Sequence, residues 1–259
     1  MPIFEKLALI VSDTERAHEV APMYRDLTDW VPLEDAEAAV VIGGDGAMLQ
    51  ALHAMLDSGI IKPVYGVNLG TVGFLMNHNR APEKLLRRIE RARSVAVAPL
   101  CMDAVTQDGR TQEFCAINEV SLLRETRQTA KIEVSVDEKV RIKELVCDGV
   151  LVATPAGSTA YNLSANGPIL PLDSNLLALT PISPFRPRRW RGALLPDRST
   201  IRFRVLESEK RPVSVVADQK EVRDIAEVSL HIAREQELRL LFDPGHALDE
   251  RIVAEQFLV

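Results

Sequence analysis

Three continuous apolar runs in the first third of the chain most strongly limit its possible folds. Leu7–Val11, Ala38–Ile42 and Val64–Val67 lack the alternation of a half-exposed strand and are typical of strands buried on both faces. Apolar residues recur at helical spacing over Met48–Leu56, and Pro82–Arg93 has the pattern of an amphipathic helix. Alternating strands and helices predict a parallel sheet with right-handed crossovers.

The hydrophobic period changes beyond about residue 97. Apolar and polar residues now alternate in short segments, which indicates strands of an antiparallel sandwich. The candidates are Ile132–Val136, Ile201–Val205, Val213–Ala217, Val228–Ile232 and Leu238–Phe242. We therefore predict an α/β domain over residues 1–97 and a β-sandwich over residues 98–259, with a C-terminal tail that can pack back on the first domain.

Composition supports a two-domain globular chain. It has 259 residues, 46% of them hydrophobic and 26% charged, which excludes a disordered protein. The net charge of −6 argues against a nucleic-acid partner, and no apolar run is long enough to cross a membrane. We expect a cytoplasmic protein in which Cys101, Cys115 and Cys147 stay free thiols, because their number is odd. Neither the cysteines nor the histidines have metal-ligand spacing, so no metal site made of these side chains is expected.

The sequence Gly43–Gly46, Gly-Gly-Asp-Gly, joins a predicted buried strand to a predicted helix. Glycines let the backbone approach a ligand closely, and a helix N-terminus offers N–H groups to a phosphate. Asp45 would repel phosphate, so we interpret it as a base for an attacking hydroxyl or as a contact to a metal bound to the phosphates. The alternative is a tight turn in which Asp45 caps the helix.

Two further segments carry polar residues in unusual places. Asp148–Pro171 is rich in glycine and hydroxyl residues, which suit a nucleotide, and Tyr161 could stack on a base. The alternative is an elaborate loop of the sandwich. Asn118 and Glu119 interrupt an apolar run and need partners if they are buried, for example ribose hydroxyls.

Together these segments resemble the bacterial NAD kinase family. The Gly43–Gly46 loop is followed by a G-x-N-x-G-x-x-G-F-L stretch, matched by Gly66, Asn68, Gly70, Gly73, Phe74 and Leu75. An Asn-Glu pair follows at Asn118 and Glu119. The string D-G-x-x-x-x-T-P-x-G-S-T-A-Y-x-x-S-A-x-G-P is then matched from Asp148 through Pro168.

The resemblance implies an N-terminal Rossmann-like α/β domain and a C-terminal antiparallel β-sandwich. It implies transfer of the γ-phosphoryl group of ATP, or of polyphosphate, to the 2′-hydroxyl of the adenosine ribose of NAD. Asp45 would be the general base, with Mg²⁺ and the N–H groups of Gly43, Gly44 and Gly46 around the phosphates. The residues expected to bind NAD are Asn118, Glu119, Asp148, Ala156, Thr159, Ala160, Tyr161, Ser164 and Gln219. Family members form homo-oligomers, so a homodimer or homotetramer is expected, and Phe257–Val259 could take part in its interface.

The chain departs from the family pattern at several positions. Ala47 follows the Gly-Gly-Asp-Gly loop where Thr or Asn is common, and Val146 replaces a basic residue. Gln219 follows Asp218 where a glycine is usual, which weakens its assignment as a ligand. The arginines of Arg186–Arg191 either contact nucleotide phosphates or form a solvated basic loop.

Two other functions remain open at this point. One is an NAD(P)-binding sensor without activity, which the presence of Asp45 disfavours because a binder gains nothing from a carboxylate beside phosphate. The other is a diacylglycerol-type lipid kinase, which shares the Gly-Gly-Asp-Gly loop. The Thr-Pro-Ala-Gly-Ser-Thr-Ala-Tyr string and the lack of a basic amphipathic face argue against it.

Overall fold

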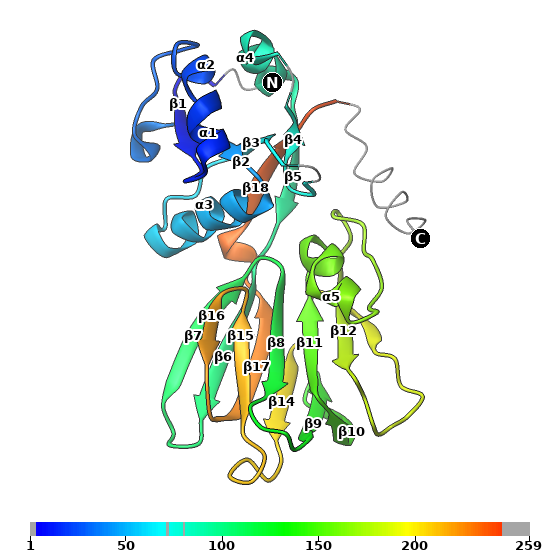
Figure 1. Cartoon of the computed structure of the whole chain (residues 1–259). Helices are drawn as coiled ribbons and strands as arrows, with labels where there is room; N and C mark the ends of the chain where they lie inside the picture. Colours follow the sequence, from blue (N-terminus) through cyan, green and yellow to red (C-terminus); the bar gives the residue numbers. More distant parts are fainter. Residues whose placement is uncertain (1–3, 71–72, 80, 245–259) are drawn as a thin grey trace. The chain divides into compact units, whose positions relative to one another are not determined.

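The computed structural model describes residues 4–70, 73–79 and 81–244. The chain divides into two compact units, drawn in Figure 1: residues up to Val97 with the segment from Gln236 onward, and Ala98–Glu235. In the described part of the chain, no helix is long and apolar enough to cross a membrane. Phe257–Val259, considered above for an interface, lies outside the described residues.

The first unit is built on one mixed sheet. Its strands are β1 (Leu7–Val11), β2 (Ala38–Gly43), β3 (Val64–Asn68), β18 (Leu238–Phe242) and β5 (Arg93–Val97), in this order, with β4 (Asn77–His78) also paired to β3. The three apolar runs become β1, β2 and β3, which pair in parallel. Every residue of β2 and β3 is buried, as their unbroken hydrophobicity predicts.

The helices of this unit follow local sequence signals. They are α1 (Glu15–Val20), α2 (Pro22–Arg25), α3 (Asp45–Ser58) and α4 (Leu85–Arg91), with 3₁₀ turns at Leu33–Asp35 and Pro82–Lys84. Thr14 caps α1 by accepting a hydrogen bond from the N–H of Ala17. Pro22 begins α2, because proline fits the first turn of a helix but not its interior. The α4 helix buries Leu85 and Ile89.

The strand β18 corrects one expectation about the sandwich. Leu238–Phe242 was predicted as one of its strands, but it pairs in parallel with β3 and antiparallel with β5, inside the sheet of the first unit. Leu238, Leu240, Leu241 and Phe242 are buried there. A short apolar run does not specify which sheet it joins, because that choice depends on pairing with distant residues.

The second unit consists of two antiparallel six-stranded sheets. One has β10 (Lys139–Cys147), β9 (Ala130–Val136), β14 (Ile201–Val205), β17 (Ile225–Ile232), β6 (Leu100–Thr106) and β7 (Thr111–Ala116), in this order. The other has β13 (Ala193–Pro196), β12 (Leu176–Ile182), β11 (Gly149–Ala153), β8 (Glu119–Arg124), β15 (Val213–Ala217) and β16 (Lys220–Val222). The short helix α5 (Tyr161–Ser164) and 3₁₀ turns at Ala156–Thr159 and Arg234–Gln236 complete the described elements.

One hydrophobic core joins the two sheets of the second unit. It includes Met102 and Phe203 from one sheet and Leu122 and Val150 from the other. Buried and partly or fully exposed residues alternate along β9 and β14, as their period-two pattern predicts. The predicted fold class, an α/β fold followed by an antiparallel β-sandwich, is confirmed.

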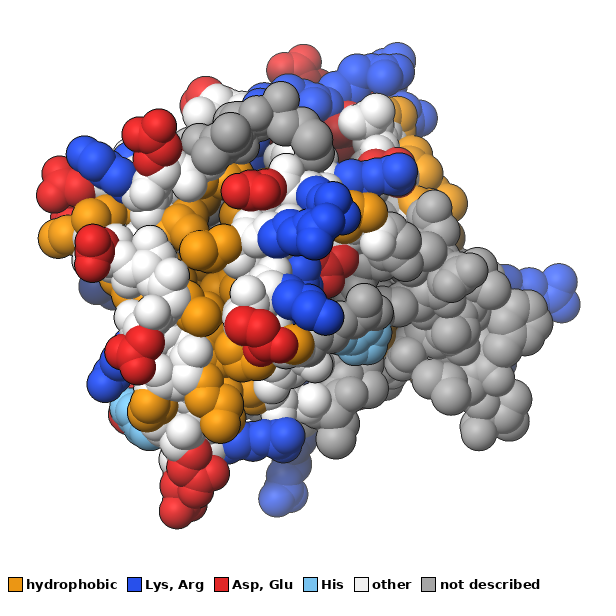
Figure 2. Space-filling view, turned by 90° about the horizontal axis from the view of Figure 1, so that it is seen from above, with side chains coloured by type: hydrophobic (Ala, Val, Ile, Leu, Met, Phe, Trp, Pro, Cys, Tyr) orange, Lys and Arg blue, Asp and Glu red, His pale blue; other side chains and the backbone are white. Residues whose placement is uncertain are grey.

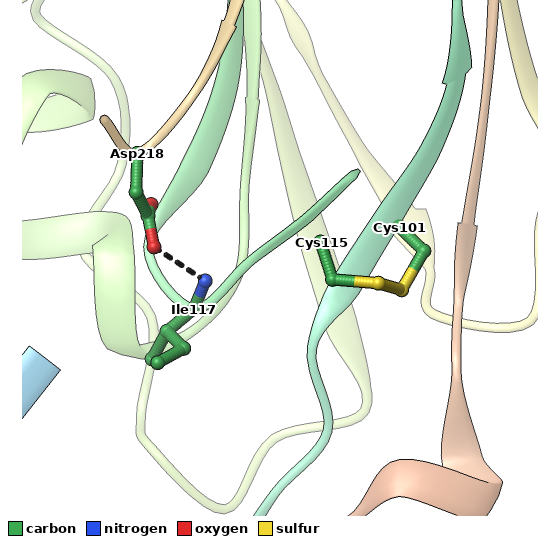
Figure 3. The surroundings of a disulfide bond; sticks show 4 residues. All are labelled: Cys101, Cys115, Ile117 and Asp218. Carbon is green, nitrogen blue, oxygen red and sulfur yellow. Dashed lines mark hydrogen bonds between the residues drawn. A yellow bond between two sulfur atoms is a disulfide. The ribbon is translucent and has the colours of Figure 1, made fainter. Parts of the chain in front are cut away.

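The expectation of three free thiols is wrong. Cys101 on β6 and Cys115 on β7 are directly opposite in the antiparallel register and form a disulfide (Figure 3). The odd number of cysteines does not exclude one pair, and strand pairing decides which two meet. Cys147 is a free thiol, and burial raises its pKa to about 12.

Candidate functional site

The loop Gly43–Gly46 lies at the carboxyl end of β2, where α/β sheets bind ligands. A Cβ atom on Gly43 would lie 2.6 Å from the Cβ of Ala47 and 2.9 Å from that of Ser12, so only glycine fits. Gly44 occupies the N-cap position of α3 and Asp45 is the first helical residue. Asp45 is therefore not the helix cap of the alternative interpretation.

The carboxylate of Asp45 is held by a second motif of the same unit. Its Oδ2 accepts a hydrogen bond of 2.7 Å from the N–H of Phe74, and its Oδ1 accepts one of 3.0 Å from the N–H of Leu75. A Cβ on Gly73 would lie 3.1 Å from Oδ1, so a larger residue there would crowd the carboxylate. These contacts fix the orientation of the Asp45 side chain.

Asn68 connects the two motifs at the edge of the sheet. It pairs with Gly43 in the parallel register, and the N–H of Leu69 donates to the carbonyl of Gly43 at 2.7 Å. The Oδ1 atom of Asn68 accepts a 2.8 Å hydrogen bond from the N–H of Gly70. The structure thus brings together the Gly-Gly-Asp-Gly loop and the described part of the G-x-N-x-G-x-x-G-F-L stretch.

In the second unit, the turn Ile117–Glu119 leads into β8 and is held by Asp218. The Oδ2 atom of Asp218 accepts from the N–H of Ile117 at 2.7 Å (Figure 3). Its Oδ1 accepts from the N–H groups of Asn118 at 3.1 Å and Glu119 at 3.2 Å. Asp218 was not among the predicted site residues. The only sequence feature that could have indicated it is its position directly before Gln219, whose own assignment as a ligand is weak.

The other side of this turn is held by the Thr-Pro-Ala-Gly-Ser-Thr-Ala-Tyr segment. The hydroxyl of Thr154 donates to the carbonyl of Ile117 at 2.6 Å, and the N–H of Thr154 donates to the carbonyl of Asn118 at 2.9 Å. A Cβ on Gly157 would collide with the backbone of Asn118. Two segments singled out from the sequence are therefore in direct contact.

Glu119 has an unusual environment for a carboxylate. Burial, together with repulsion by the negative charge of Asp218, raises its pKa to about 7. Its Oε2 atom is buried and has no hydrogen-bond partner among the described residues. The backbone N–H of Tyr161 favours the charged form, but this effect is smaller than that of burial. Such an acceptor suits a ligand hydroxyl.

The hydroxyl-rich segment divides into internal and surface residues. Ser158 and Asn162 are fully buried; Ser158 donates to the carbonyl of Pro155, and Asn162 donates to the carbonyls of Ser158 and Pro168. These polar groups hold the loop itself. Among the predicted ligand residues of this segment, Ala156 is buried, Thr159, Ala160 and Tyr161 are half-buried, and Ser164 is exposed.

Asp148 does not lie with Asn118 and Glu119. It precedes the first residue of β11, whereas Glu119 pairs with Ala153 at the other end of that strand. Asp148 and Ala153 are five residues apart, which corresponds to about 17 Å along the strand. The carboxylate of Asp148 pairs instead with the guanidinium of Arg124 at 2.7 Å. Tyr161 lies within the influence of both carboxylates: burial, then the charges of Glu119 and Asp148, raise its pKa.

Two other predicted features are on the surface. Gln219 is exposed in the two-residue turn between β15 and β16. The arginines of Arg186–Arg191 are exposed, and the guanidinium groups of Arg186 and Arg188 lie 5.5 Å and 5.7 Å from the ring centre of Phe185. Of the two interpretations of this segment, a phosphate-binding site or a solvated basic loop, this arrangement fits the solvated loop.

The surface charge and the possible metal ligands limit how the protein can bind an anionic ligand. On the face shown in Figure 2, acidic and basic side chains are interspersed, in keeping with the net charge of −6. Attraction of a polyanion must therefore be local. Among the residues that the structure describes, no group of three His, Cys, Asp or Glu side chains could hold a metal ion.

Comparison with known families covers both units. Residues 6–93 match the family model for the ATP-NAD kinase N-terminal domain, and residues 117–238 match that for the ATP-NAD kinase C-terminal domain. The chain is 61% identical over 255 residues to the NAD kinase of Rhizorhabdus wittichii, covering 98% of this chain and 99% of that protein. It is 59% identical over 254 residues to the NAD kinase of Zymomonas mobilis, covering 98% of each.

Solved structures share the fold at lower sequence identity. Yeast NADH kinase complexed with NADH has a TM-score of 0.79 and 20% identity, covering 100% of this chain and 89% of that one. An NAD kinase from Archaeoglobus fulgidus in complex with ATP has a TM-score of 0.73 and 22% identity, covering 96% of this chain and 98% of that one.

Proposed function

This chain belongs to the NAD kinase family, and we propose that Asp45 is the general base with which it phosphorylates the 2′-hydroxyl of the adenosine ribose of NAD. In this reaction the hydroxyl oxygen attacks the γ-phosphorus of ATP, its proton passes to the carboxylate of Asp45, and ADP leaves. Membership of the family disfavours both the sensor without activity and the lipid kinase.

The observation that carries this assignment is the fixed carboxylate of Asp45 beside the glycine loop. Two backbone N–H groups orient it, and a carboxylate oxygen can accept more than one hydrogen bond. A positioned base contributes about 10²–10⁴-fold to rate. Gly44 and Gly46 leave open space in which phosphate groups would approach the N-terminus of α3, and Gly43 lets the loop pack closely against Ser12 and Ala47.

The proposed NAD contacts come from the second unit. The amide of Asn118 and the carboxylate of Glu119 would bind ribose hydroxyls, and the half-buried ring of Tyr161 would stack on a base. Ala156, Thr159, Ala160, Ser164 and Gln219 would line the remainder of this region. Asp148, whose carboxylate pairs with Arg124, would line the same pocket from the other end of β11, where its charge still acts on Tyr161.

We further propose that the phosphoryl donor is bound together with Mg²⁺. The described residues form no cluster of three metal ligands, and Mg²⁺ that arrives on the phosphates of ATP would need only one or two protein carboxylates beside phosphate oxygens. When bound, Mg²⁺ would neutralise charge on the transferring phosphoryl group. We also propose a homodimer or homotetramer, which sedimentation or light scattering can test.

The substitution Asp45→Asn tests the assignment of the base. We expect NADP formation from ATP, Mg²⁺ and NAD to fall at least 100-fold, because Asn cannot accept the proton. Calorimetry should show NAD affinity within about threefold of the wild-type value, because proposed NAD contacts remain. Asp57→Asn, on the exposed side of α3, is the matched control and should keep normal turnover. Full turnover by Asp45→Asn would rule out Asp45 as the general base.

A further inference from the structure

The two-residue turn between β15 and β16 holds a carboxylate to which the reaction chemistry assigns no role. Asp218 follows β15, and its side chain points to the Ile117–Glu119 turn (Figure 3). Resting on the proposed function, we infer that Asp218 is a positioning residue for NAD, which acts by fixing the backbone of Asn118 and Glu119 without contacting the dinucleotide.

The first argument is the number of hydrogen bonds that converge on this side chain. Three consecutive backbone N–H groups donate to the two oxygens of Asp218, at distances from 2.7 to 3.2 Å. The N–H of Asp218 donates in return to the carbonyl of Glu119 at 3.2 Å. Hydrogen bonds to a charged acceptor are roughly twice as strong as neutral ones. One side chain thus determines the direction of three successive peptide units.

The second argument is that the opposite side of the same turn is held independently. Thr154 engages the carbonyls of Ile117 and Asn118, and Gly157 packs against the backbone of Asn118. Thr154 and Gly157 belong to the segment that is proposed to bind NAD. Asp218 therefore holds the turn against the ligand-binding segment, and a loss of its contacts would change where Asn118 and Glu119 lie relative to Tyr161.

The third argument is the backbone of Asp218 itself. Its φ angle is +50°, a left-handed conformation that Asp and Asn adopt more readily than most residues. Only Asp also supplies two acceptor oxygens and a negative charge for three donors. Two independent requirements therefore favour Asp at this position: the left-handed backbone of the turn, and the three hydrogen bonds that its carboxylate accepts from N–H groups.

Asp218 also acts on Glu119 through space. Its negative charge, together with burial, raises the pKa of Glu119 to about 7. The groups identified as affecting that titration are Asp218, from the β15–β16 turn, and the backbone N–H of Tyr161, from α5. Removal of the Asp218 charge should lower the pKa of Glu119, an effect that a purely structural role would not produce.

Steady-state kinetics of Asp218→Asn in the full-length protein test this inference. Asn keeps the shape and tolerates the left-handed backbone, but it presents an N–H₂ group where an acceptor is needed. We expect the KM for NAD to rise at least tenfold, with kcat changed less than threefold and the KM for ATP unchanged. The pH at which the KM for NAD changes should move to a lower value. Asp218→Glu, which retains the charge, should restore part of the loss.

The control is Asp224→Asn, in the next turn of the chain, where the φ angle is also positive and the side chain is exposed. It should leave all constants unchanged. Asn118→Ala distinguishes a failure of the positioning role of Asp218 from a failure of the proposed NAD contacts of the turn. If Asn118→Ala raises the KM for NAD and Asp218→Asn does not, the positioning role is wrong. If wild-type turnover is normal and neither substitution changes the KM for NAD, the proposed NAD contacts of the turn are wrong as well.

Discussion

At the scale of single residues, Glu119 shows how burial sets the properties of the proposed site. The sequence indicates only that a carboxylate in an apolar run needs partners. In the structure, Asp218 repels this carboxylate, and its Oε2 has no hydrogen-bond partner among the described residues. Its raised pKa means that the charged form is less favourable in the folded protein than in the unfolded chain.

This difference predicts a dependence of stability on pH. The ordinary pKa of 4.5 is raised to about 7, so the folded state becomes relatively less stable as the pH rises from 4.5 to 7. Glu119→Gln cannot ionise and should unfold at a higher temperature than the wild type at pH 8. We expect the difference in Tm to be small at pH 4.5 and largest above pH 7.

Calorimetric melting curves of both proteins across this range provide the measurement. Glu113→Gln, at an exposed position of β7, is a matched control that removes a surface carboxylate and should leave the Tm close to that of the wild type. A Tm difference for Glu119→Gln that is constant between pH 4.5 and 8 would contradict the assigned environment.

At the scale of elements, the attachment of β18 to the first sheet depends on a polar cluster. Arg88 on α4 pairs with Asp243, which follows β18, at 2.6 Å, and both side chains are nearly buried. The hydroxyl of Tyr65 on β3 donates to the same carboxylate at 2.7 Å. The side chain of Asn77 bonds the backbone of Leu241 and Asp243 on either side of the strand end. These contacts secure a strand that is remote in sequence from its neighbours.

Breaking the Arg88–Asp243 pair should be costly. Arg88→Met removes the guanidinium but leaves the carboxylate of Asp243 in a largely buried site, for which about 3 kcal/mol of stability is expected to be lost. Urea denaturation gives the free energy of unfolding. Arg91→Met, on the exposed side of α4, should change it by less than about 0.5 kcal/mol. Equal effects of the two substitutions would show that the Arg88–Asp243 pair does not stabilise the first unit.

At the scale of the whole molecule, the chain crosses between its two units twice. The first unit takes residues from both ends of the sequence, and the second is continuous from Ala98 to Glu235. In the sheet of the first unit, β18 lies between β3 and β5. A fragment that ends at residue 97 therefore lacks an internal strand.

This topology predicts different behaviour for two fragments. Residues 98–235 keep both sheets and their shared core and should fold alone, with a cooperative thermal transition. Residues 1–97 lose the hydrogen-bonding partner between β3 and β5 and should not fold cooperatively. Fusion of residues 236–244 to this fragment through a flexible linker should restore the transition. Circular dichroism during heating measures each, and a cooperative transition of residues 1–97 alone would refute the prediction.

Local residue patterns were sufficient to predict the features that depend on residue period. Continuous apolar runs distinguished β2 and β3 from the alternating β9 and β14, because burial on two faces or one sets the residue period. The continuous run of β1 was also expected to be buried on both faces, but β1 lies at the edge of its sheet and only Leu7 and Ala8 are buried. The family motifs likewise marked Asp45 and the Asn118–Glu119 pair. The position of β18, the Cys101–Cys115 disulfide and the contact of Asp218 with the turn were decided only by the tertiary structure. Each of these joins residues far apart in the chain, and such pairing depends on strand order and register, which no local period specifies.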